Sequence, residues 1–78
     1  MNKNKIIVGG RYRHYKGNEY VVLAVGRNSE NTDEGLVVYQ GQYDDLKFGH
    51  RPIWIRPEKM FLDQVIINGK KLDRFEII

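Results

Sequence analysis

Short runs of apolar residues alternate with polar ones along the chain, and glycine, proline or polar clusters separate the runs. This period of two is typical of β-strands that bury one face. The first two runs, residues 12–16 and 19–25, flank Gly17-Asn18, a pair that suits a tight type II′ turn. We therefore expect a hairpin in which Lys16 faces Glu19, Tyr15 faces Tyr20 and His14 faces Val21.

This register divides the hairpin into two faces. The face with Tyr12 and His14 is predicted to lie against the core, because arginines are rarely buried without a partner. Its other members are Val21 and Leu23. The opposite face is charged and aromatic and holds Arg11, Arg13, Tyr15, Tyr20, Val22 and Ala24. A slip of one residue would exchange the faces, so the buried side of this hairpin stays open.

Polar clusters and glycine residues delimit the next strands and loops. Residues 28–35 are polar and acidic, which predicts a solvated loop. Residues 36–43 form a third strand, in which Val37, Tyr39 and Tyr43 share one side and Gly41 indicates a bulge or a close approach of another group. A second loop spans residues 44–51, and residues 52–56 form a short fourth strand.

Proline and glycine mark the last third of the chain. Pro57 suits the first position of a helix, and residues 57–64 are expected to form about two turns with Met60 and Phe61 against the sheet. Asn68-Gly69 fits a type I′ turn between two apolar runs, which is a strong hairpin signal.

These elements predict a mainly β fold with five or six short antiparallel strands and one short helical turn. An SH3-like barrel or a strongly bent sheet suits the pattern, and an open α+β roll is the alternative. The length of 78 residues allows one domain, here residues 9–78, preceded by a mobile tail at residues 1–8. So short a chain has a small core.

The composition of the chain says more about where the protein is expected to be found than about what it does. The chain has no cysteine and no apolar run long enough for a signal peptide or a membrane span, so we expect a soluble cytoplasmic protein without a membrane partner. The formal net charge is +3, and Lys3 and Lys5 of the tail contribute two of these charges. The folded part is then nearly neutral, so attraction to a polyanion would have to be local.

A family resemblance rests on four segments, GRYRHYKGNEYVVLAVGRNSE, VVYQGQY, WIRPEKMF and NGKKLDRF. Together they resemble a family of short bacterial proteins, the domain-of-unknown-function family sixteen-fifty-three, from about Gly10 to Phe75. The resemblance implies an SH3-like β domain and no activity or site residues. The segment between Tyr43 and Trp54 is slightly longer than the family pattern implies.

The leading candidate site is the charged and aromatic face of the first hairpin. Rings that stack on bases beside guanidinium groups that grip phosphate suit nucleic acid or another anionic ligand. The same residues also suit plain sheet stability through cross-strand aromatic pairs and cation–π contacts. The candidate ligand-binding residues are Arg11, Arg13, Tyr15, Tyr20, Trp54 and Arg56, with Arg74 as an extension.

Two other readings involve protein partners. Trp54 and Pro57 beside a helical turn are compatible with a groove for an extended proline-containing peptide, or with simple closure of the core. The C-terminal RFEII is a potential sheet edge for homodimerisation.

Catalytic chemistry finds little support. Ser29 and Thr32 lie in a polar segment without a base nearby in sequence, and cysteine is absent. Asp44, Asp45 and His50 lie in one loop, which is more typical of a solvated segment than of a metal site. The sequence therefore predicts no enzyme, no cofactor and no metal, but a small binding module with nucleic acid or protein as the partner.

Overall fold

The computed structural model describes residues 5–78 and is mainly β, with one short helix. Five strands form an antiparallel sheet in the order β6-β3-β2-β1-β9. These strands are β1 (Arg11–His14), β2 (Glu19–Asn28), β3 (Asn31–Gly41), β6 (Ile53–Pro57) and β9 (Phe75–Ile77). Two small two-stranded sheets complete the fold: β4 (Asp44–Asp45) with β5 (Gly49–His50), and β7 (Gln64–Ile67) with β8 (Lys70–Asp73).

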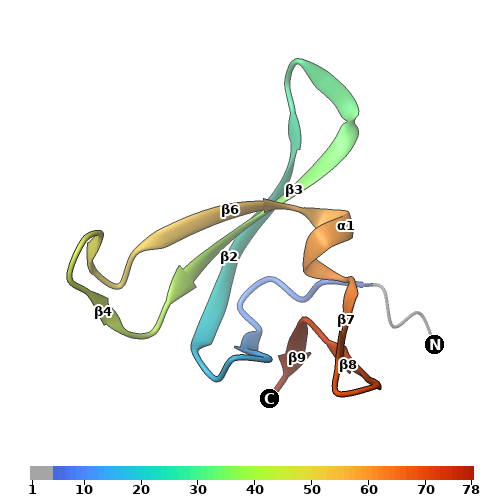
Figure 1. The fold of residues 1–78 in the computed structure, drawn as a ribbon. Coiled ribbons are helices and arrows are strands. Elements are labelled where there is room, and N and C mark those ends of the chain that lie inside the picture. The colour runs from blue at the N-terminus through green and yellow to red at the C-terminus, as the bar shows by residue number, and fades with distance from the viewer. Residues whose placement is uncertain (1–4) are drawn as a thin grey trace.

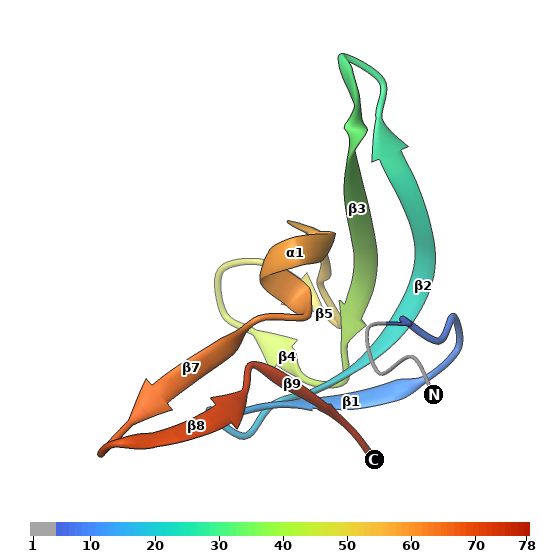
Figure 2. The ribbon, with the colours of Figure 1, turned by 90° about the vertical axis from the view of Figure 1, so that its right-hand side faces the viewer.

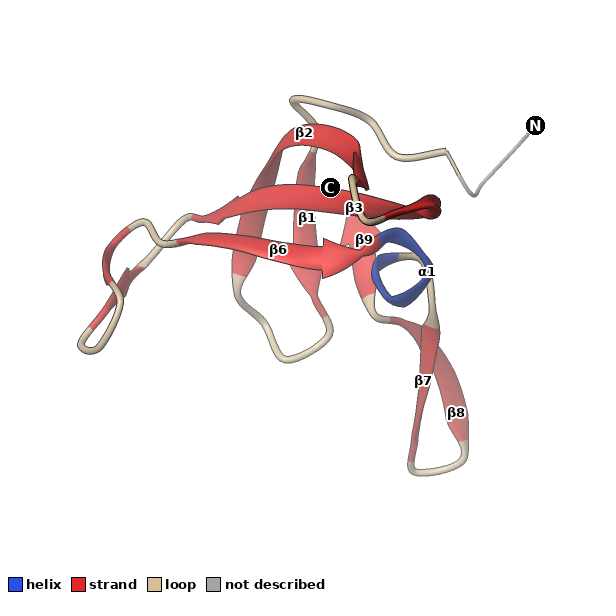
Figure 3. Cartoon of the chain, turned by 90° about the horizontal axis from the view of Figure 1, so that it is seen from above, coloured by secondary structure: helices blue, strands red, loops and turns tan. Residues whose placement is uncertain are grey.

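The main sheet is strongly bent, and the helix α1 (Glu58–Phe61) lies on its inner side (Figure 1, Figure 3). The bent antiparallel sheet predicted from the strand pattern is confirmed. The sheet does not close into a barrel, because β6 and β9 remain its two edges in the described part of the chain.

The core lies between the inner face of the sheet and α1. Five of its seven buried side chains are tyrosines or valines of β1, β2 and β3, and the rings of Phe61 and Phe75 stack on each other with centroids 4.1 Å apart. The full set is Tyr12, Tyr20, Val22, Val37, Tyr39, Phe61 and Phe75. A core of this composition is held mainly by edge-to-face aromatic contacts.

The predicted register of the first hairpin is wrong. Tyr12 pairs with Tyr20 and Arg13 with Glu19, so the connection spans residues 15–18 instead of the two residues Gly17-Asn18. Two local hydrogen bonds accompany this register. The His14 ring accepts the Lys16 N–H, and the His14 carbonyl accepts the Gly17 N–H, so the chain already turns at residues 14–17. Gly17 follows with a φ of 113°, which glycine adopts readily.

This change exchanges the two faces of β2. Tyr20 and Val22 enter the core, whereas Val21 and Leu23 do not, and Tyr12 keeps its predicted place inside. An odd shift in register has this effect because successive side chains point to opposite faces.

The predicted loop at residues 28–35 is also wrong. β2 continues to Asn28 and β3 begins at Asn31, so the two strands form a long hairpin that projects beyond the sheet (Figure 2). The side chains of residues 29–33 are exposed. Backbone pairing without a buried face leaves no hydrophobic alternation in the sequence.

Other details of the prediction hold in part. Gly41 is a close-approach site, because a Cβ atom there would lie 2.6 Å from the Tyr43 ring. Asn68 and Gly69 both have positive φ, as a type I′ turn requires. The helix has one turn instead of two, with Phe61 buried and Met60 exposed.

The predicted mobile tail at residues 1–8 is only partly described. Residues 1–4 lie outside the described residues. Ile6 packs against the core, and the Ile7 N–H donates to the Tyr12 hydroxyl at 3.1 Å.

Candidate anion-binding site

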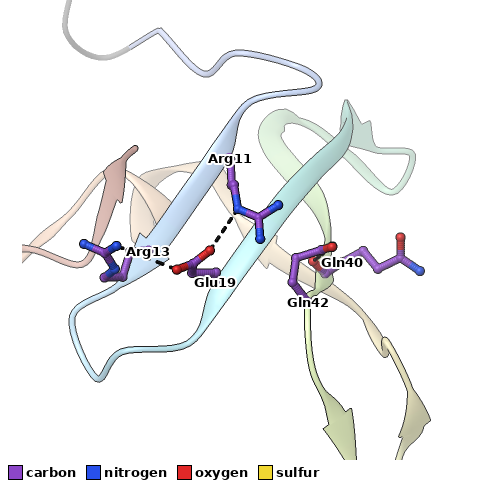
Figure 4. Close-up of polar contacts among 5 residues, drawn as sticks. All are labelled: Arg11, Arg13, Glu19, Gln40 and Gln42. Atoms are coloured by element: carbon purple, nitrogen blue, oxygen red, sulfur yellow. Dashed lines mark hydrogen bonds and ion pairs between the residues drawn. The ribbon is translucent and has the colours of Figure 1, made fainter.

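Arg11 and Arg13 lie on the outer face of the sheet, on either side of Glu19 (Figure 4). The Arg11 Nε donates to the Glu19 carboxylate at 2.8 Å, and an Arg13 terminal nitrogen lies 3.7 Å from its other oxygen. The hydrogen bond from Arg11 lowers the pKa of Glu19. On its other side, Arg13 pairs across the strands with Glu76. Glu19 therefore pairs with both arginines, and Glu76 is a second acidic residue opposite Arg13.

The rest of this outer face offers amide groups. Gln40 and Gln42 lie beside Arg11 at the end of β3 (Figure 4). Their side-chain nitrogens donate to the Arg51 and Gln40 carbonyls. The outer face thus presents paired charges and engaged amides, and it is a poor site for an anion.

The tyrosines of the predicted site lie elsewhere. Tyr20 is part of the core, where burial and then a hydrogen bond with Tyr43 raise the pKa of its hydroxyl. Tyr15 lies in the turn after β1, with its ring 4.5 Å from that of His14. The structure therefore does not bring the six predicted ligand-binding residues onto one face.

Trp54 and Arg56 lie on the inner side of β6, because their strand neighbours Ile53 and Ile55 are exposed on the outer face. The Trp54 indole N–H donates to the Tyr43 hydroxyl at 3.0 Å. Its ring meets the ring of Phe48 edge to face at 5.2 Å, and Phe48 is exposed. Trp54 and Phe48, the aromatic pair, give the inner side of β6 an accessible aromatic end.

Arg56 is fixed beside the core. Its Nε donates to the Tyr39 hydroxyl at 2.9 Å, and its guanidinium carbon lies 5.4 Å from the centroid of the Phe75 ring. Within residues 5–78 no carboxylate lies within ion-pair distance of this guanidinium. Asp44, Asp45 and Glu58, the acids of the neighbouring segments, form no ion pair with it.

Two further basic residues lie near Arg56, because the charges of Arg56 and Arg74 both act on His14. His14 meets the Phe75 ring edge to face at 4.9 Å. Arg74 directly precedes Phe75, and its carbonyl accepts the Tyr15 N–H, which places it next to His14 along β1. The Arg74 Nε is buried and has no hydrogen-bond partner in the described part of the chain. We call His14, Arg56 and Arg74 the cationic cluster.

Electrostatics show that these three groups share one environment. Burial lowers the pKa of His14, and the positive charges of Arg56, Arg74 and Lys16 lower it further. The His14 Nδ1 accepts the Lys16 N–H, so the neutral ring carries its proton on Nε2 and remains a donor there. The cluster thus offers hydrogen-bond donors and positive charge and forms no ion pair among the described residues, although Asp73 and Glu76 line the same groove as His14.

Two grooves flank these elements. One of about 230 Å³ lies at Pro57 and is lined by acidic residues of β3 and α1, including Asp33, Glu34 and Glu58, but not by Trp54. The other, of about 210 Å³, lies between the end of β1 and β8 and is bordered by Asp73 and Glu76. The groove at Pro57 therefore does not include the Trp54 ring, and the groove for a proline-containing peptide stays a prediction.

Sequence reasoning found Arg56 and Trp54, and named Arg74 as an extension of the wrong face. It missed His14 and Phe48. The contact of His14 with Phe75 depends on the bend of the sheet, and the contact of Phe48 with Trp54 depends on how the β4–β5 hairpin lies against β6. The sequence carries no local signal for either contact.

The described residues hold no cluster of three or more histidine, aspartate or glutamate side chains arranged for a metal ion. None of the helices among them is both long and apolar enough to span a membrane.

Fold and site define a small bent-sheet β domain with an aromatic core and a basic inner edge. Residues 10–77 match the family DUF1653, a protein of unknown function, and the chain belongs to this family. It is similar in structure to a DUF1653 protein from Bordetella bronchiseptica, with a TM-score of 0.76 and 32% sequence identity over 92% of this chain and 87% of that one. No curated protein matches the chain. The family resemblance seen in the sequence is confirmed.

Proposed function

We propose that the domain is a non-catalytic binding module for single-stranded nucleic acid, held through a backbone phosphate at the cationic cluster. The observation that supports this most is Arg56, a half-buried arginine without a carboxylate partner in the described chain. A buried charge usually has a partner, because removing it from water is costly. A ligand phosphate would supply that partner.

Arg56 is also suitably oriented for a phosphate. Tyr39 and the Phe75 ring hold its Nε and its face, which leaves the two terminal nitrogens for a bidentate contact. The Nε2–H of His14 and the guanidinium of Arg74 would add further donors, since the charges of Arg56 and Arg74 both act on His14. Fixing these side chains before binding lowers the entropy cost of holding the ligand.

The aromatic pair supports a nucleic acid over an isolated phosphate. Trp54 lies two residues before Arg56 on the same side of β6, about 7 Å away along the strand. The exposed Phe48 ring extends this line, and Lys47 lies 5.4 Å from its centroid. Bases of a single strand stack on such rings without sequence preference.

The test is fluorescence anisotropy of a labelled ten-nucleotide oligo(U) and oligo(dT) with the full chain at several salt concentrations. We expect binding at low salt, and we expect Arg56→Gln to weaken it and to lower the salt slope by about one. Arg27→Gln is the matched control, because it removes the same charge from the exposed distal part of β2.

Two outcomes would contradict the proposal. One is a lack of binding to either oligonucleotide at low salt. The other is equal weakening by Arg56→Gln and Arg27→Gln, which would indicate a general charge effect. If Arg11→Gln weakened binding and Arg56→Gln did not, the ligand would lie on the outer face instead.

Cytoplasmic location, expected from composition, stays a prediction.

A further inference from the structure

The edge strand β6 carries hydrogen-bonding groups that nothing in residues 5–78 occupies. The Gly41 N–H donates to the Pro52 carbonyl, and the register continues with Tyr39 opposite Trp54. Because donors alternate along an antiparallel strand, the N–H and C=O groups of Ile53 and Ile55 point away from β3. β6 pairs with β3 alone in the described chain.

The side chains at this edge are apolar as well. Ile53 and Ile55 are 57% and 66% exposed, and on the outer face they lie beside Gln40 and Val38 of β3. Natural sheets usually protect a free edge with lysine, proline or a bulge. Here Pro52 and Pro57 bracket the strand, but the two residues whose backbone groups point outward are isoleucines.

We propose that β6 pairs antiparallel with β6 of a second copy of this chain, with the two-fold axis at Trp54. In this register Ile53 of one copy faces Ile55 of the other. The pairing would satisfy the free N–H and C=O of both residues in both copies. The set of free groups is therefore complementary to itself, which is what a two-fold interface requires.

Backbone geometry selects this register over its neighbours. The alternation of donors allows only even shifts. With the axis at Ile53, Ile55 of one copy would face Arg51 of the partner subunit, which lies outside β6 and has a positive φ of 44°. With the axis at Ile55, Ile53 of one copy would face Pro57 of the partner subunit, which has no N–H to donate. With the axis at Trp54, Ile53 and Ile55 face each other, so the free backbone groups of both residues are paired.

Exposed apolar residues at the two ends of β6 agree with the antiparallel arrangement. Leu46 and Phe48 lie on the β4–β5 hairpin before β6, and Met60 lies on α1 after it; all three are exposed. An antiparallel pair brings the hairpin of one copy beside the helix of the other. β9 is the other free edge, but it is shorter, and only Ile77 and Ile78 are exposed apolar residues there.

The test is sedimentation equilibrium of the full chain up to about 1 mM, because the five-residue edge of β6 makes a small interface and a weak dimer. We expect the mass to rise with concentration, and we expect Ile55→Lys to restore a monomer. Ile66→Lys is the matched control, since Ile66 is 68% exposed on the β7–β8 hairpin and is not part of this edge.

Three results would overturn the inference. They are a constant monomer mass at all concentrations, a dimer that Ile55→Lys leaves intact, and a dimer that Ile77→Lys abolishes while Ile55→Lys does not. The last result would place the interface on β9. Circular dichroism of each variant verifies that it is folded, so that loss of the dimer is not loss of the fold.

Discussion

Gly41 shows how one residue limits the packing of the aromatic core. A Cβ atom at this position would lie 2.6 Å from the Tyr43 ring, which is fixed by hydrogen bonds to Tyr20 and Trp54. We expect Gly41→Ala to lower the free energy of unfolding by about 1–3 kcal/mol through overpacking. Urea denaturation measures this. Gly26→Ala is the control, because nothing lies within 4 Å of its Cβ position; an equal loss in both variants would contradict the explanation.

His14 makes stability depend on pH. The fold lowers its pKa from the ordinary 6.5, chiefly through burial, so below that pH the unfolded chain binds the proton more readily. The free energy of unfolding should therefore fall as the pH drops below 6.5, and the contribution is fully present above it. His14→Asn keeps an acceptor for the Lys16 N–H but does not titrate. Its urea midpoint should decline less between pH 7 and pH 5, and an identical decline would exclude His14 as the cause.

At the scale of residues, the sequence predicts best where backbone chemistry is specific. Gly41, and Asn68 with Gly69, were identified because few residues tolerate their surroundings or their positive φ. Tyr20 was misplaced because a hydrogen bond from the Lys16 N–H to the His14 ring lengthens the turn. Such a side-chain contact has no signature in the hydrophobic pattern.

The β7–β8 hairpin is an element that packs mainly on itself. Ile66, Ile67 and Leu72 are exposed, and the hairpin projects away from the main sheet (Figure 2). An isolated two-stranded hairpin is marginally stable in water. We therefore expect amides of residues 64–73 to exchange by local opening, much faster than those of Val37 and Tyr39 in the core. Hydrogen exchange followed by NMR measures both, and equal protection would show that the hairpin opens only with the whole domain.

Turn chemistry and burial explain which strands and hairpins could be predicted from the sequence. The β7–β8 hairpin has a turn with specific chemistry and was found, although its faces remain exposed. The distal part of β2 and β3 was expected to be a loop, since Asn28 pairs with Asn31 across a polar turn and no buried face marks the strands. Hydrophobic alternation appears in a sequence only where one face of a strand is buried. Paired strands with both faces exposed therefore cannot be predicted from this pattern.

At the scale of the molecule, the mainly β class and the bent antiparallel sheet followed from the pattern, whereas the candidate site did not. Arg56 and Phe75 meet only because the sheet bends and returns β9 to β1. The sequence places the two residues far apart and on elements whose order in the sheet is not sequential. Predicting strands from the sequence therefore identified the sheet, but it did not identify the cationic cluster on the inner face of the sheet.

Phe75 connects the whole molecule, because its ring contacts Tyr20, Tyr39, Phe61 and His14 from four different elements or their ends. Truncating so buried an aromatic ring costs about 3–5 kcal/mol. A domain of this size has only about 4–12 kcal/mol of stability in total. We therefore expect Phe75→Ala to lose a large share of the stability of the domain, and Phe75→Leu to lose less.

Ile77→Ala is the matched control on the same strand, since Ile77 is 50% exposed and its truncation should cost less than about 1 kcal/mol. Thermal unfolding followed by circular dichroism compares the three variants. In Phe75→Leu, Arg56 and His14 lose the ring that holds them, so affinity for oligonucleotides should fall below that of Ile77→Ala even at temperatures where both are folded. Equal affinity in the two folded variants would contradict this expectation. It would show that the Phe75 ring stabilises the core but does not contribute to oligonucleotide binding by the cationic cluster.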